Sequence, residues 1–547
     1  MKWFPVVAAV LVSSCGGAGV STGASGPTAT ERPVAAVLAS HCTDVVAADL
    51  GEGTLCVDSG FRPDVDQFSF ENWGRSPQAD RNVTVQTLID LFGHSTVCMP
   101  GPETECVMRP RTAQKLDDWN VALGGGRCEG MATLSQRMFL RYETASEYSP
   151  RALDAADLVR ADGPLAQSIV YWWATQFVPE VTRAAAESRT KSPLRIVDEL
   201  IRGLANGVGH TVGMYSSGTG HSVTPFAVTR RAGDFVIHVY DNNRPGVRAE
   251  IVVSSADDTW SYENGRSGEE SSAVWSGGTG TLEITPMSAR QGPFTCPFCN
   301  EPAPSGDTVL TVTNQADAPA NWVVVDAGTS GVIEQTAEGW RNSVEGATVD
   351  VGKSGFANTA RISLPASVAG ARVELRHTAP QVSESVVTLR RPGMADIQVR
   401  NARSTAPVGA ARVSRPVIEW SGGTTTVNAH DGDTVVSLAG ATNLANVTVR
   451  SHDELVVSRV TDTTVEVSYK GAAVDSRVTV DLSPAGATTT ELTVTKGSLA
   501  TRAAETTALK VAGPRSVRFE PLPAVTTTTR TGSPPTTYPT IEVTLPG

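Results

Sequence analysis

Cys128 lies where a glycine-rich loop meets the start of a helical pattern, in the segment GGGRCEGMATLSQRMF. Met131, Leu134 and Met138 follow it at spacings that place them on one apolar helical face. The glycines before it allow a tight turn and a close approach of the backbone to a substrate. A thiol in the first helical turn lies beside unpaired N–H groups at the positive end of the helix dipole. Both favour the nucleophilic thiolate, so we expect Cys128 to be a catalytic nucleophile.

A general base for Cys128 is expected from a predicted hairpin further along the chain. His221 opens the strand-like run HSVTPFAVTRR, and after a short loop the chain returns as FVIHVYDNNRPG. His221 and Asp241 would then lie close together at the open ends of the two strands, where the carboxylate could orient the imidazole. If paired residue numbers sum to an even number, His221 shares a face with Asp241 and Asn243. If the sum is odd, it shares a face with Asn242, and the irregular loop leaves both registers open.

This order of motifs resembles the papain-like cysteine peptidases, in which Cys, His and Asp or Asn follow one another along the chain. Within them, GGGRCEGMA, GHSV and VYDNNRPG look like the bacterial branch related to double-glycine peptidases. DQFSFENWG (66–74) and LFGHSTVC (91–98) are also similar to segments of exported proteins of that branch. The resemblance covers residues 61–248 and implies a papain-like fold.

The same resemblance implies roles for single residues. Cys128 would be the nucleophile, His221 the base, and Asp241 the residue that orients His221. The papain pattern has a glutamine about six residues before the nucleophile, where this chain has Ala122. Asn120 is the nearest amide side chain, so Asn120 and the backbone N–H of Cys128 are the candidate oxyanion donors.

Structural roles are the alternative for several of these residues. Cys128 could be a buried inert thiol, and Asp241 could serve only the turn that DNNRPG predicts. We expect His210 and His238 to be structural, because His238 falls on the opposite strand face from Asp241.

The chain begins with the pattern of a bacterial lipoprotein signal. Lys2 precedes an apolar run at 6–12 that is too short to span a bilayer, and VSSC resembles a lipobox. The resemblance implies cleavage before Cys15 and lipidation of its sulfur, with residues 16–32 as a flexible tether; a plain secretory signal is the alternative. We expect the protein on the extracytoplasmic face of the cell membrane, lipid-anchored or secreted.

The remaining seven of the eight cysteines are an odd number in a chain bound for an oxidising compartment. Proximity suggests three disulfides, and the candidates are Cys42 with Cys56, Cys98 with Cys106, and Cys296 with Cys299. Cys128 is then left over, although six cysteines allow 15 connectivities. CPFC could also be a redox motif or half a zinc site, but no second CxxC accompanies it.

The length and the periodicities predict several domains. Helical patterns at 85–92, 152–159, 165–184 and 193–204 precede several strand patterns, so we expect an α+β papain-like domain over residues 33–300. Val- and Thr-rich alternating runs then predict all-β sandwich-like modules at 305–405 and 413–525. A Thr/Pro-rich tail follows at 526–547.

The composition narrows the class of partner. The chain of 547 residues has a net charge of −12 and no basic run longer than an arginine pair, which is unlike a nucleic-acid binder. We expect a peptide or cell-envelope substrate, a membrane contact only through the lipid anchor, and no cofactor or metal. The leading hypothesis is a cysteine hydrolase that cleaves an amide or thioester bond. The alternatives are a catalytically inactive surface binding protein and a transglutaminase-like acyl transferase.

Overall fold

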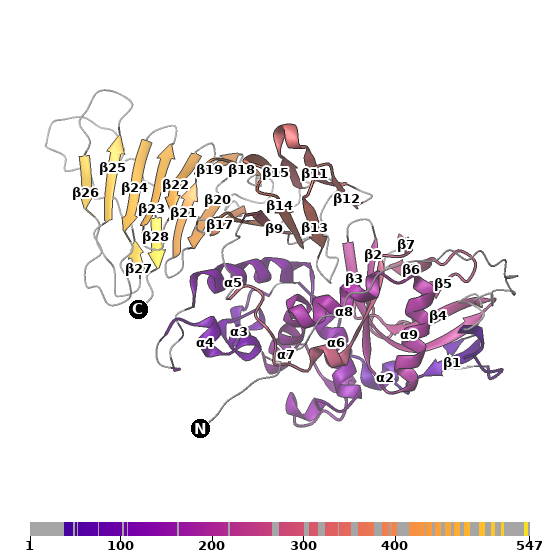
Figure 1. Ribbon diagram of the computed structural model, residues 1–547. Helices are drawn as coiled ribbons and strands as arrows, with labels where there is room; N and C mark the ends of the chain where they lie inside the picture. Colours follow the sequence, from indigo (N-terminus) through magenta and orange to yellow (C-terminus); the bar gives the residue numbers. More distant parts are fainter. Residues whose placement is uncertain are drawn as a thin grey trace, which may run out of the picture.

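The described part of the chain forms an α+β region followed by an all-β region, as Figure 1 shows for a computed structural model of the protein. This agrees with the expected fold class at that level. The signal at 1–15 and the tether at 16–32 lie outside the described residues. Beyond residue 457 only strand backbones are described. The described residues are 38–46, 50–51, 53–74, 76–100, 103–104, 106, 108–160, 163–216, 219–264, 273–299, 306–314, 323–336, 339–351, 359–376, 385–392, 394, 396–401, 415–430, 432, 434–439, 444–449 and the later strands given below.

Helices dominate the first part of the α+β region. They are α2 (Pro63–Asp66), α3 (Val85–Phe92), α4 (His94–Val97), α5 (Pro110–Ala122), α6 (Cys128–Phe139), α7 (Gly163–Ala174), α8 (Pro179–Arg189) and α9 (Pro193–Ala205). The helix expected at 165–184 is interrupted before Pro179, whose ring and missing N–H favour the start of a new helix. The helix expected at 152–159 is reduced to a 3₁₀ turn, Ala155–Asp157. The Asp154 and Asp157 carboxylates accept hydrogen bonds there from the N–H groups of Ala156 and Leu153, which competes with helical pairing.

One antiparallel sheet completes the α+β region. Its strands are β1 (Thr54–Asp58), β2 (His210–Ser216), β3 (Thr219–Arg231), β4 (Asp234–Tyr240), β5 (Ala249–Val253), β6 (Trp260–Asn264), β7 (Ala273–Gly277) and β8 (Leu282–Pro286). The order across the sheet is β7-β6-β5-β4-β3-β2-β8, and β1 pairs with the far part of β3. The apolar face of α9 packs on one side of this sheet. Helix α6 lies on the other side, where Ser135 and Thr224 are in hydrogen-bonding contact.

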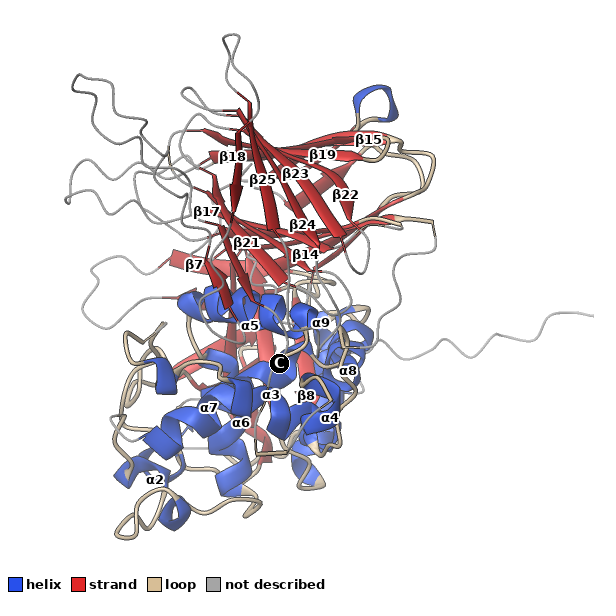
Figure 2. Cartoon of the chain, turned by 90° about the vertical axis from the view of Figure 1, so that its left-hand side faces the viewer, coloured by secondary structure: helices blue, strands red, loops and turns tan. Residues whose placement is uncertain are grey.

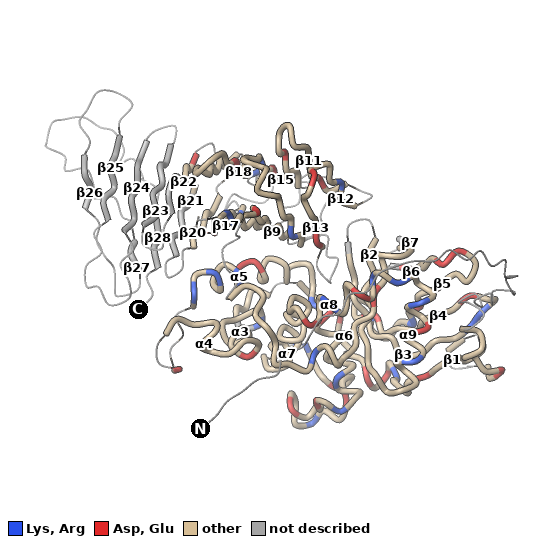
Figure 3. The backbone as a smooth tube through the Cα atoms, in the orientation of Figure 1, with Lys and Arg blue, Asp and Glu red and all other residues tan. Residues whose placement is uncertain are grey.

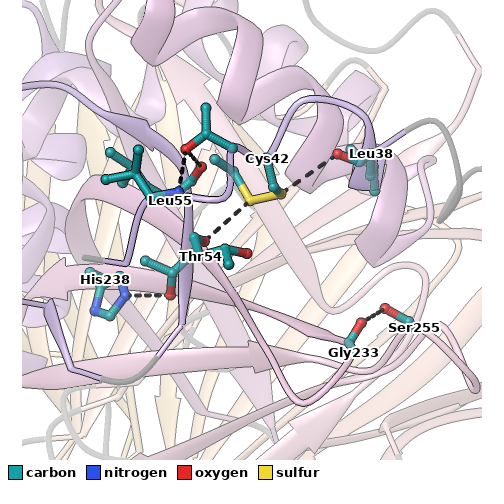
Figure 4. The surroundings of a disulfide bond; sticks show 11 residues. Leu38, Cys42, Thr54, Leu55, Gly233, His238 and Ser255 are labelled. Carbon is teal, nitrogen blue, oxygen red and sulfur yellow. Dashed lines mark hydrogen bonds between the residues drawn. A yellow bond between two sulfur atoms is a disulfide. The ribbon is translucent and has the colours of Figure 1, made fainter. Parts of the chain in front are cut away.

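The described cysteines, other than one, are joined in disulfides. The pairs are Cys42 with Cys56, Cys98 with Cys106, and Cys296 with Cys299, and Cys128 is the free thiol. These are the neighbouring pairs that the sequence suggested. Figure 4 shows the first pair, which links the residues that follow Leu38 to strand β1.

The all-β region consists of two large antiparallel sheets around one apolar core. Its strands are β9 (Thr308–Asn314), β10 (Val323–Asp326), β11 (Val332–Thr336), β12 (Gly339–Asn342), β13 (Thr348–Val351), β14 (Thr359–Leu364), β15 (Gly370–Leu375), β16 (Ser385–Arg390), β17 (Asp396–Asn401), β18 (Arg415–Ser421), β19 (Thr424–His430), β20 (Thr434–Ala439), β21 (Leu444–Val449), β22 (Glu454–Val460), β23 (Thr464–Lys470), β24 (Asp475–Asp481), β25 (Leu492–Gly497), β26 (Glu505–Ala508), β27 (Ser516–Arg518) and β28 (Ile541–Thr544).

These sheets run across the boundary that the sequence suggested between two modules. Strand β15 pairs with β18 in one sheet, and β17 pairs with β20 in the other. Strands of 305–405 and 413–525 therefore share both sheets, because edge strands with unpaired backbone groups are joined by the next strands of the chain. Within the Thr/Pro-rich tail, β28 pairs with β21 and β27.

Helix α5 forms a contact between the two regions, directly below the strands in Figure 2. Gln114 donates to the main-chain oxygens of Asp396 and Ser437, and Gln398 donates to the main-chain oxygen of Gln114. Arg111 pairs with Asp396 at 3.0 Å. A cavity of about 200 Å³ lies between this helix and the sheet. Figure 3 shows acidic and basic residues interspersed over the described backbone.

Candidate active site

A β-bulge in β3 decides which residue faces His221. Paired residue numbers sum to an odd number near the hairpin turn and to an even number at the open end, where Thr224 pairs with Tyr240. The shift lies between Pro225 and Ala227. Proline has no N–H for the ladder and occurs at bulges for that reason. The even register places Asp241, and not Asn242, on the face of His221.

Cys128, His221 and Asp241 come together at this end of the sheet. His221 Nε2 lies 2.7 Å from Asp241 Oδ1, and the imidazole also hydrogen-bonds the Cys128 side chain. Since Nε2 faces the carboxylate, Nδ1 remains for the sulfur. Cys128 is the first residue of α6, and its loop turns at Gly126 with a φ of 124°, a value that favours glycine. All three side chains are buried, and Cys128 is only 1% exposed.

The Asp241 carboxylate is held by four donors. Oδ1 accepts from His221 and from the Asn243 N–H, the latter at 2.9 Å. Oδ2 accepts from the Tyr262 hydroxyl and from Arg244 Nε. A carboxylate that is buried and fully hydrogen-bonded stays ionised and keeps one orientation. Asp241 can therefore fix the His221 ring.

The charges of this cluster reinforce one another. Burial by itself lowers the pKa of His221, but the Asp241 charge and hydrogen bond and the contact with Cys128 raise it to about 10. Burial raises the pKa of Asp241, and the His221 charge with the hydrogen bonds from His221, Tyr262 and Asn243 outweighs it, so that this pKa lies well below its usual range. The imidazole is thus a cation at neutral pH, and it lies beside the side chain of Cys128.

The residues that directly follow Cys128, His221 and Asp241 link helix α6, strand β3 and the end of strand β4 by hydrogen bonds. Beyond the last pair with β4, the edge of β3 meets the N-terminus of α6. There, Asn242 Nδ2 donates to Ser222 O at 2.8 Å and to Cys128 O at 3.1 Å. Ser222 Oγ donates to Glu129 Oε2. The residues that follow the nucleophile, the base and the acid therefore hold those residues in place.

Glu129 also forms a buried ion pair behind the nucleophile. Its carboxylate accepts from Arg290 Nη2 and from Thr211 Oγ1, and both Glu129 and Arg290 are almost fully buried. Arg290 reaches Thr175 as well. Buried pairs of this kind leave an uncompensated charge when one partner is removed. The pair anchors the first turn of α6 to strand β2 and to the residues after β8.

Asn120 is not available as an oxyanion donor in this structure. Its side-chain oxygen accepts from Val83 N–H at 3.0 Å, and its amide nitrogen donates to Val83 O at 2.9 Å. Asn120 lies on α5, and it pairs with the residue before Thr84, the cap of α3, as a side chain does when it fixes a loop. Of the expected oxyanion donors, the backbone N–H of Cys128 at the start of α6 remains.

The two other histidines of the sheet serve structural roles. His238 Nε2 lies 2.9 Å from Thr229 Oγ1, and its ring is visible in Figure 4. Burial lowers the pKa of His238 to about 4, although Glu250 opposes that change. His210 Nδ1 lies 3.0 Å from Val208 O.

Sequence reasoning missed several residues around the site. Tyr262 and Arg244 bind Asp241 from β6 and from the loop after β4. Glu129 has no sequence signal, because a single glutamate next to a nucleophile forms no pattern. Asn72 belongs to DQFSFENWG, a segment whose familiarity was the only signal. It contacts both loops of the site.

One group among the described residues has three side chains that could ligate a metal: His94, Cys98 and Cys106 lie within 4.8 Å of one another. The sulfurs of Cys98 and Cys106 are joined to each other in a disulfide, so these two cysteines do not offer a pair of thiolates. No described helix is both long enough and apolar enough to cross a membrane. In comparisons with known proteins, the chain matches no protein-family model, no curated protein and no solved structure.

Proposed function

We propose that the protein is an exported papain-like cysteine hydrolase that cleaves an amide or thioester bond with Cys128, His221 and Asp241. The observation that carries the proposal is the 2.7 Å bond between His221 and Asp241, with the free thiol of Cys128 on the same imidazole. Nucleophile, base and orienting acid in contact are the signature of covalent acyl transfer.

The reaction follows from these groups. The Cys128 thiolate attacks the carbonyl carbon, and the Cys128 N–H stabilises the oxyanion. The His221 imidazolium gives its proton to the leaving amine or thiol, so that the bond to it breaks and a thioester to Cys128 remains. Neutral His221 then takes a proton from water, which attacks the thioester and releases the acid and the free thiol. Asp241 keeps the ring oriented throughout.

A catalytically inactive binding protein is the second candidate, favoured by the burial of the site. Cys128 is 1% exposed and His221 5% exposed, so a substrate must displace covering residues before the sulfur can attack. Segments that cover an active site and move on binding are common in hydrolases. Burial alone therefore does not outweigh the contacts of the three residues.

The proposal is tested with p-nitrophenyl acetate as an acylating probe and mass spectrometry of the Cys128 peptide. We expect a burst of about one p-nitrophenolate per chain, an acetyl group on Cys128, and then slower turnover. Cys128→Ser should abolish both phases, and His221→Ala should suppress turnover. His238→Ala is the matched control, because that histidine lies on the other face of the sheet. No burst in the wild-type chain would favour the binding protein.

The same experiment separates the acyl-transferase alternative. With a primary amine added, a hydrolase still releases mainly acetate, whereas a transglutaminase-like enzyme releases the acetylated amine. Lipid anchoring through Cys15 and an extracytoplasmic site of action belong to the proposal too. They are tested by metabolic labelling with a fatty acid, which Cys15→Ser should abolish.

A further inference from the structure

Asn72 contacts the two loops that carry the nucleophile and the acid. Its Oδ1 accepts from the Arg127 N–H at 2.7 Å, one residue before Cys128. Its Nδ2 donates to Asn243 Oδ1 at 3.0 Å, and its main-chain N–H donates to Asn242 O at 2.8 Å. One residue, far from both loops in sequence, thus bridges them with three hydrogen bonds.

The segment that carries Asn72 is itself firmly docked. The fully buried Arg127 donates to Trp73 O at 2.9 Å and to Gly74 O, and its guanidinium lies over the Trp73 ring. A Cβ on Gly74 would lie 2.4 Å from Gly124 O, so the segment is in direct contact with the glycine loop. This contact fixes where the Asn72 amide lies.

Gly126 leaves room for the Asn72 amide because it has no side chain. A Cβ at Gly126 would lie 2.7 Å from Asn72 Nδ2, closer than real Cβ contacts. The glycine loop before the nucleophile therefore serves the tight turn and also the approach of Asn72. Any larger residue there would push the amide away from Asn243 or from Arg127.

We propose that Asn72 is a positioning residue that holds Cys128 against His221. It does so by hydrogen-bonding both the loop before the nucleophile and the loop after Asp241. The inference rests on the proposed function, since it assigns Asn72 a part in activating the thiol. Cys128 and Asp241 lie on different elements, α6 and the end of β4, so their separation depends on such long-range bonds. Without the hydrogen bonds of Asn72, the distance between the Cys128 sulfur and the His221 imidazole increases, and the thiolate loses the nearby cation.

The test measures alkylation of Cys128 by iodoacetamide in the full chain carrying Cys15→Ser, followed by mass spectrometry. The readout is the ratio of the rate at about pH 6 to the rate at about pH 9.5, which lie below and above the ordinary thiol pKa. A change in accessibility affects both rates equally and cancels in the ratio. A purely structural role would lower the melting temperature and leave the ratio unchanged.

We expect Asn72→Ala to lower the ratio about tenfold, as befits the loss of one or two hydrogen bonds. Gly126→Ala, which keeps the amide but displaces it, should lower the ratio in the same direction. Asn120→Ala is the matched control, because it also removes two side-chain hydrogen bonds in this region, and it should leave the ratio within about twofold.

The outcomes separate the two proposals. A high wild-type ratio that Asn72→Ala and Gly126→Ala leave unchanged would overturn the positioning role alone. A low wild-type ratio, as for an ordinary thiol, would overturn the proposed function and the positioning role with it. If Asn72→Ala does not fold, Asn243→Ala removes only the acceptor of the amide and is judged by the same ratio.

Discussion

Replacing Asp241 by asparagine should uncouple His221 from Cys128. The pKa of His221 is about 10, against an ordinary value of about 6.5 for histidine. That difference corresponds to about 5 kcal/mol, shared between the contacts of His221 with Asp241 and with Cys128. Because burial alone lowers this pKa, we assign Asp241 at least about 2 kcal/mol, or roughly thirtyfold in the protonation equilibrium.

Asparagine cannot reproduce the contacts of the carboxylate. Asp241 accepts four hydrogen bonds, two on each oxygen, and asparagine has only one acceptor oxygen. Its NH₂ group would face either His221 or the donors Tyr262 and Arg244. The neutral side chain therefore removes the charge that keeps the imidazole protonated, and it also disturbs the ring orientation.

The assay is iodoacetamide labelling of Cys128 over about pH 5 to about pH 10, on either side of the ordinary thiol pKa. In Asp241→Asn the rate at about pH 6, relative to that at about pH 9.5, should fall at least about thirtyfold. Asp118→Asn is the matched control, an equally buried aspartate on α5 that pairs with Lys115. A ratio in Asp241→Asn within about threefold of the wild type would refute the reasoning.

Further predictions concern the residues around the site. Glu129→Gln leaves Arg290 buried without its carboxylate and should lower the free energy of unfolding by about 3 kcal/mol in urea denaturation; a loss below about 1 kcal/mol would contradict it. His238 has a pKa of about 4 in the folded state, so the folded protein binds fewer protons than the unfolded chain between about pH 4 and about pH 6.5, and stability is lost as the pH is lowered through that range. His238→Gln should reduce this acid-induced loss of the free energy of unfolding by on the order of 2 kcal/mol. An equal loss in the wild type and in His238→Gln would argue against the low pKa of His238. Tyr262→Phe removes one of four donors to Asp241 and should lower the low-pH labelling ratio about fivefold, with an unchanged ratio as the contrary result.

Local patterns in the sequence were sufficient for several of the elements and for the three residues that meet at the candidate site. The expected helix at 85–92 coincides with α3, and strands such as β9 and β17 form within the stretch after residue 305 where alternating runs predicted β modules. Cys128 stands at the first residue of a helix, as its glycine loop and apolar periodicity indicated. These features depend on neighbours within one or two turns or strands, which the sequence displays directly.

Long-range features could not be predicted. The prediction of two separate modules was wrong, because strands of 305–405 and of 413–525 pair with one another in both sheets. No local pattern in the sequence shows which strands will pair. Asn120 is the nearest amide side chain before Cys128 along the chain, but in the structure its amide binds Val83. Asn72, 56 residues before Cys128, approaches the site only through folding.

The sequence by itself determined a free cysteine at a helix start, a histidine and an acidic loop on one hairpin, and an α+β region before a β-rich one. Tertiary structure decided which acid faces the histidine. A single bulge beside Pro225 changes the strand register by one residue, and a strand shows alternate residues on opposite faces. Asp241 therefore turns to His221, while Asn242 turns to the main chain of Cys128.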